Sequence, residues 1–89
     1  MNLYKAIDVW KKADKETAIR YRCFEALDSG RFCVQSADFY TLPLDANQVA
    51  NLTRQFVDLF IQQDPAQRSS EYSTLGEAIA AHDKAFETA

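Results

Sequence analysis

Two cysteines and one histidine are the side chains of this sequence best suited to nucleophilic or acid–base chemistry. Cys23 and Cys33 stand ten positions apart, which is neither a CxxC motif nor a metal-binding spacing. A catalytic cysteine needs a nearby base, and His82 is the single imidazole that could supply it. One histidine also cannot build a multi-histidine metal site. We therefore expect two buried, reduced thiols and a histidine at the edge of a helix core face. A small enzyme, or a subunit of an enzyme, that uses a Cys/His pair is an alternative.

A basic segment, Arg20-Tyr21-Arg22, has aromatic residues on both sides in the sequence. On a sheet, such a surface could bind RNA, because rings stack on bases and arginines contact phosphates. The chain, however, carries 13 acidic against 10 basic residues, a net charge of −3 that disfavours phosphate binding. It also has only two glycines, which excludes a glycine-rich phosphate loop. We expect no cofactor, and nucleic acid is not the favoured partner.

Length and composition limit the class of protein. A chain of 89 residues has room for one domain, and its 47% hydrophobic content favours a folded core over disorder. The sequence shows no apolar run near the roughly 18 residues that a membrane span requires. Its first residues lack the basic and apolar regions of a signal peptide. Two cysteines are few for a small secreted domain, so we expect a cytoplasmic protein.

The elements that must position these side chains follow from hydrophobic periodicity. Alternation with a period of two predicts strands over about 3–10, 17–27 and 31–40. Apolar residues at helical spacing predict helices over about 46–63 and 74–87, with a polar loop at 65–73. Asp45 with Gln48, and Thr74 with Glu77, form capping-box patterns at the helix starts. We predict one α+β domain over 1–89, a three-stranded antiparallel meander followed by two helices packed on one sheet face.

The turns predict a register for the strands. A three-residue loop at 28–30, with Gly30 in a positive-φ position, places Leu27 opposite Arg31 and Arg20 opposite Asp38. If Trp10 lies opposite Ala18, Asp8 falls opposite Arg20. Charges of opposite sign would then form a row, Asp8–Arg20–Asp38, across the sheet. In this register both cysteines share the other, apolar face, where they lie diagonally on adjacent strands.

The face with the charged row carries more large aromatic groups than a solvated surface needs. Exposed apolar patches of several hundred Å² often mark contact surfaces, and Arg and Trp are frequent interface anchors. The hypothesis that follows is a non-enzymatic protein-interaction module, acting on a protein partner or as a homodimer. A small-ligand or nucleic-acid-binding sheet is a further alternative. The residues assigned to the partner-binding face are Tyr4, Trp10, Arg20, Arg22, Phe24 and Phe32.

Overall fold

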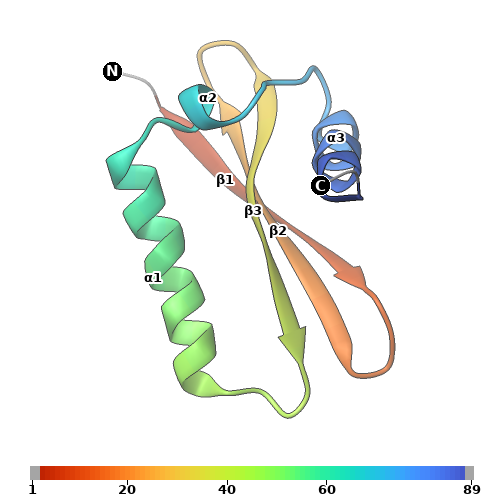
Figure 1. Ribbon diagram of the computed structural model, residues 1–89. Coiled ribbons are helices and arrows are strands. Elements are labelled where there is room, and N and C mark those ends of the chain that lie inside the picture. Colours follow the sequence, from red (N-terminus) through yellow and green to blue (C-terminus); the bar gives the residue numbers. More distant parts are fainter. Residues whose placement is uncertain (1–2, 88–89) are drawn as a thin grey trace.

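The computed structural model describes residues 3–87, apart from the side chains of 66, 86 and 87. Three strands form one antiparallel sheet in the order β1-β2-β3, and the helical segments follow in the chain. This arrangement confirms the predicted α+β class and the order of the elements (Figure 1). A short helix lies within the segment predicted to be a loop. The elements are β1 (Tyr4–Lys12), β2 (Thr17–Ala26), β3 (Arg31–Thr41), α1 (Ala46–Gln62), α2 (Pro65–Arg68) and α3 (Leu75–Glu87).

Side-chain caps fix the starts of the two longer helices, at the predicted positions. The carboxylate of Asp45 accepts hydrogen bonds from the backbone N–H groups of Asn47 and Gln48 at the start of α1. At the start of α3, the hydroxyl of Thr74 accepts from the N–H of Glu77 at 3.1 Å. Each cap satisfies donors that the first helical turn leaves without an intrahelical partner.

The β2–β3 turn is one residue longer than predicted, and a bulge then restores the register. Ala26, not Leu27, lies opposite Arg31, and Gly30 adopts a φ of 69°. A register shift follows next to Arg22, after which Arg20 lies opposite Asp38 as predicted. Between the turn and the shift, every side chain of β3 points to the face opposite the predicted one, since successive strand residues alternate.

The β1–β2 pairing differs from the predicted register by two residues. Trp10 lies opposite Arg20, and Asp8 lies opposite Arg22. The predicted row Asp8–Arg20–Asp38 is therefore wrong at its first member. The cause is a tighter turn: the backbone N–H of Ala13 donates to the carbonyl of Thr17 at 3.0 Å, so β1 continues to Lys12, two residues past its predicted end, while β2 begins at Thr17 as predicted. A shift of two leaves each side chain on its predicted face.

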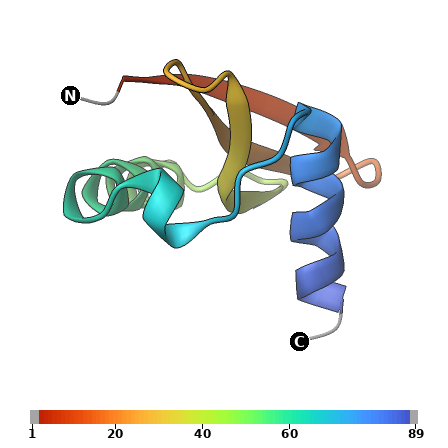
Figure 2. The same cartoon turned by 90° about the horizontal axis from the view of Figure 1, so that it is seen from above.

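The two long helices pack on opposite faces of the sheet, so the prediction that both cover one face is wrong. Neighbouring residues of β2 show this directly. Arg22 donates to Thr53 of α1 at 3.3 Å, whereas Tyr21 donates to Asp83 of α3 at 2.8 Å. Figures 1 and 2 show α1 and α3 on the two sides of the sheet. The face expected to be open is thus largely covered by α1.

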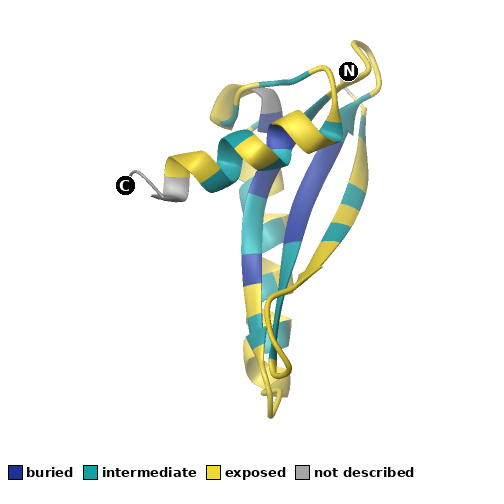
Figure 3. Ribbon diagram, turned by 90° about the vertical axis from the view of Figure 1, so that its right-hand side faces the viewer, coloured by how far each residue is buried: buried dark blue, intermediate teal, exposed yellow. Residues whose placement is uncertain are grey.

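Burial is concentrated in the middle of β2 and β3. One cluster, on the α3 side, contains the buried residues Tyr21, Cys23, Val34 and Ala78. On the α1 side, Phe24 is 4% exposed. Figure 3 shows that burial fades toward the end of the sheet that holds the β1–β2 turn. The covered sheet therefore has one end where large side chains remain accessible.

Candidate functional site

Two arginines and one carboxylate meet on the α1 face of the sheet. Nε of Arg22 lies 2.6 Å from Oδ2 of Asp38, and Nη2 of Arg20 lies 3.4 Å from the same oxygen. Arg22 and Asp38 are each 5% exposed. Adjacent strands bring the three together, because Arg20 and Asp38 are directly paired and Arg22 is two residues along β2. Burial makes this cluster costly to disrupt, since an unpaired charge would be left in a poorly solvated place.

Aromatic rings hold the Arg20 guanidinium in place. Its central carbon lies 5.2 Å from the centre of the Trp10 ring and 5.3 Å from that of Tyr40. Both distances are within the range of cation–π attraction. Arg20 also donates a hydrogen bond to the hydroxyl oxygen of Tyr40. Arg22 is held similarly, 4.5 Å from the centre of the Phe56 ring of α1.

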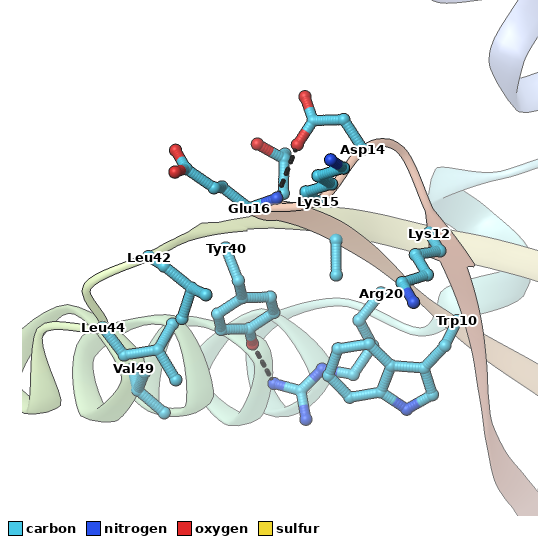
Figure 4. A pocket seen from close by; sticks show the side chains of 12 residues that line it. Trp10, Lys12, Asp14, Lys15, Glu16, Arg20, Tyr40, Leu42, Leu44 and Val49 are labelled. Atoms are coloured by element: carbon cyan, nitrogen blue, oxygen red, sulfur yellow. Dashed lines mark hydrogen bonds between the residues drawn. The ribbon is translucent and has the colours of Figure 1, made fainter.

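A groove opens beside Arg20, at the end of the sheet where burial is low. Its volume is about 390 Å³, within the range of small-ligand pockets. Walls come from three parts of the chain that meet here: the β1–β2 hairpin, the end of β3 with the segment that follows it, and the first turn of α1. We call it the Trp10 groove (Figure 4). It is lined by Trp10, Lys12, Asp14, Lys15, Glu16, Thr17, Ala18, Arg20, Tyr40, Leu42, Leu44 and Val49.

The apolar side chains of the Trp10 groove are unusually accessible. Trp10 and Leu42 are each 55% exposed, and Leu44 is 58% exposed. Covering apolar surface is favourable by about 25 cal/mol for each Å² removed from water. A partner that covers these side chains would therefore gain binding free energy. Together they form an apolar surface with a cation, Arg20, at its base.

The six residues predicted for the partner-binding face do not lie together in the structure: some line the groove, some are covered by α1, and one lies on the other face of the sheet. Trp10 and Arg20 line the groove. Arg22 and Phe24 are buried beneath α1, and Tyr4 is half-buried beside Phe24, with ring centres 5.9 Å apart.

Phe32 lies on the opposite face, and its predicted position is wrong. It packs against the core cluster on the α3 side. Its backbone exchanges two hydrogen bonds with Tyr72, at 2.8 and 2.7 Å. The longer β2–β3 turn explains the difference, because it reverses the faces of β3 residues before the bulge.

Ten of the twelve lining residues were not predicted from the sequence. Six of them belong to the β1–β2 hairpin, and the other four form the opposite wall: Tyr40, Leu42, Leu44 and Val49. Alternation along β3 from Asp38 already places Tyr40 on the face of Arg20. Two leucines on either side of Pro43, between a strand and a helix cap, are also an apolar pair in a segment expected to be exposed. These two leucines were the feature of the sequence that could have indicated this wall of the groove.

The thiols do not lie together on one face as predicted. Cys23 belongs to the core cluster on the α3 side, whereas Cys33 pairs with Phe24 and therefore faces α1. They are 0% and 3% exposed, and neither forms a disulfide. Burial raises the pKa of Cys23 to about 12 and also raises the pKa of Cys33. His82 packs against the ring of Tyr21, and burial lowers its pKa.

These thiols should react slowly with a thiol reagent in the folded protein. A raised pKa keeps a thiol protonated near neutral pH, and the thiolate is the reactive form. We expect labelling by Ellman's reagent at pH 7.5 to be at least about a hundredfold slower in buffer than in denaturant. Fast labelling of either cysteine in the folded protein would contradict the buried, protonated state.

Two classes of site are not found in the part of the chain that is described. Residues 3–87 contain no group of three or more His, Cys, Asp or Glu side chains that could hold a metal ion. None of the helices described has the length and apolar content needed to cross a membrane. Comparison with protein-family models, with curated proteins and with solved structures finds no match for the chain.

Proposed function

We propose that this protein is a protein-interaction module and that the Trp10 groove is its docking site. One observation carries the proposal: a groove of about 390 Å³ whose walls hold the half-exposed side chains of Trp10, Leu42 and Leu44. Interface cores are rich in aromatic residues and arginine, and hot spots often contain Trp, Tyr and Arg. Trp10, Arg20 and Tyr40 supply all three residue types in contact with one another.

The alternatives receive less support from the same contacts. For a Cys/His enzyme, both thiols are buried with raised pKa values, which is the reverse of an activated nucleophile. For a nucleic-acid-binding sheet, Tyr21 and Arg22 are buried and Arg22 is paired with Asp38. Free thiols are the state expected in a reducing compartment, so the cytoplasm remains our proposed location.

Site-specific photo-crosslinking tests the proposal. A photoreactive phenylalanine analogue replaces Leu44 in the groove wall, or, as a matched control, Leu27 in the β2–β3 turn. Both leucines are more than half exposed, but Leu27 lies outside the groove. In cells that express the protein, we expect a discrete cross-linked protein from position 44 and not from position 27. Trp10→Ser should reduce its yield at least about tenfold, as hot-spot truncation does.

The identity of the cross-linked species also identifies the partner. Either a different protein or a second copy of this chain, captured from position 44 alone, supports docking at the groove. Equal capture from both positions, or capture that survives Trp10→Ser, would refute the groove as the docking site.

A further inference from the structure

We infer that the partner presents a carboxylate to Arg20, next to an apolar side chain that fills the Trp10 groove. This inference rests on the proposed function, because it specifies the chemistry of the docking partner. A segment in which Leu, Ile or Phe stands beside Asp or Glu has that chemistry.

Charge is the first reason. Two guanidinium groups, those of Arg20 and Arg22, contact the same oxygen, Oδ2 of Asp38. Arg22 holds the better geometry, at 2.6 Å and through Nε, whereas Arg20 stands at 3.4 Å. Asp8 lies opposite Arg22, but its side chain is exposed and outside the groove lining. The cluster that borders the groove therefore has two cations for one buried carboxylate.

The position of Arg20 is the second reason. Its side chain is 16% exposed and lines the groove, while its Nε is buried without a hydrogen-bond partner. Trp10 and Tyr40 hold the guanidinium in one orientation, so little conformational entropy is lost when a ligand binds. Because Nη2 already donates to Asp38 and Tyr40, Nη1 is the group that meets the ligand carboxylate.

The charged side chains at the rim of the groove do not change the sign of its net charge. Two lysines, Lys12 and Lys15, are balanced by two carboxylates, Asp14 and Glu16. Figure 4 shows these four side chains on the hairpin that overhangs Trp10, Arg20 and Tyr40. Arg20 is thus the cation that sets the preference at the base, and the leucines of the wall set the preference for an apolar group beside it.

A pair of small probes isolates the carboxylate. 4-Phenylbutanoate and 4-phenylbutanamide share the ring and the chain and differ only in the charged group. Ligands of this size bind with Kd values of about 1 mM. Trp10 is the only tryptophan, so its indole N–H gives a single NMR signal that reports binding in the groove. We expect the acid to bind about tenfold more tightly than the amide, as for a charge-assisted hydrogen bond.

Two arginine variants provide the contrast. Arg20→Gln should reduce the affinity for the acid about tenfold and leave that for the amide unchanged. Arg68→Gln removes the same charge from an exposed position on α2 and should change neither affinity. The spectrum of each variant also shows whether it is folded.

The outcomes separate this inference from the proposed function. If the acid and the amide bind with equal affinity, as read from the Trp10 signal, recognition of a carboxylate by Arg20 is refuted, while docking of an apolar group in the groove stands. If neither probe shifts it, the inference is refuted, and the cross-links from position 44 still decide the proposed function. Loss of those cross-links would refute docking whatever the probes show.

Discussion

Asp38→Asn is expected to lower the free energy of unfolding by about 3–5 kcal/mol, the cost of breaking a buried ion pair by removing one partner. Asp38 is 5% exposed and accepts from both Arg20 and Arg22. The amide oxygen can still accept hydrogen bonds but carries no formal charge, so two partly or fully buried guanidinium groups lose their counter-ion. Since small domains have only about 5–15 kcal/mol of stability, the loss is a large part of the total. Urea unfolding followed by circular dichroism measures it.

Asp8→Asn is the matched control. Asp8 lies on the same face, opposite Arg22, but is exposed. Its removal should change the free energy of unfolding by less than about 0.5 kcal/mol. A comparable loss from both variants would show that the sheet face responds to net charge and that burial of the Asp38 pair is unimportant.

A double variant tests the cause. Combining Asp38→Leu with Arg22→Met removes both members of the 2.6 Å pair and leaves apolar groups of similar size. Replacing a buried ion pair in this way is often neutral or stabilising. We expect most of the lost stability to return, and no recovery would mean that Arg20 alone requires the Asp38 carboxylate.

The ends of most elements were predictable because local chemistry decides them. Alternation over the strands and the caps at Asp45 and Thr74 depend on nearby residues in the chain, and the structure has them at or near the predicted places. The opposition of Arg20 and Asp38 was also predicted. It holds for a reason that was not visible: the β2–β3 turn adds one residue, and the bulge next to Arg22 compensates for it.

The covered face could not be predicted by counting apolar residues. Phe24 and Arg22 were assigned to an open face because both helices were placed on the other one. Either helix offers an apolar stripe, and nothing in its sequence states which face of the sheet receives it. The contacts that decide are long-range, such as that of Phe24 with Phe56, and the site at Trp10 is what α1 leaves uncovered.

Phe24→Ala should detach α1 from the sheet. The Phe24 ring stacks on Phe56 with centres 5.4 Å apart and packs on Phe60 at 5.1 Å. No residue of α1 is fully buried, so these ring contacts, with that of Tyr4 on Phe60 at 6.0 Å, supply much of its apolar attachment. Truncating a buried phenylalanine costs about 3–5 kcal/mol. We expect that loss to appear mainly as local opening of α1, because polar contacts to Thr53 and the Phe56 carbonyl are few.

Hydrogen exchange resolved by residue distinguishes local opening from global loss of stability. The amides of α1 should exchange much faster in Phe24→Ala, whereas those of α3, held by Asp83 against Tyr21, should change less. Phe39→Ala is the control, because Phe39 is 59% exposed and its truncation should leave both helices as they are. Equal acceleration in α1 and α3 would show that the two faces unfold as one unit. If α1 alone opens, the wall that Val49 contributes to the Trp10 groove opens with it, so Phe24→Ala should also weaken docking without touching the groove.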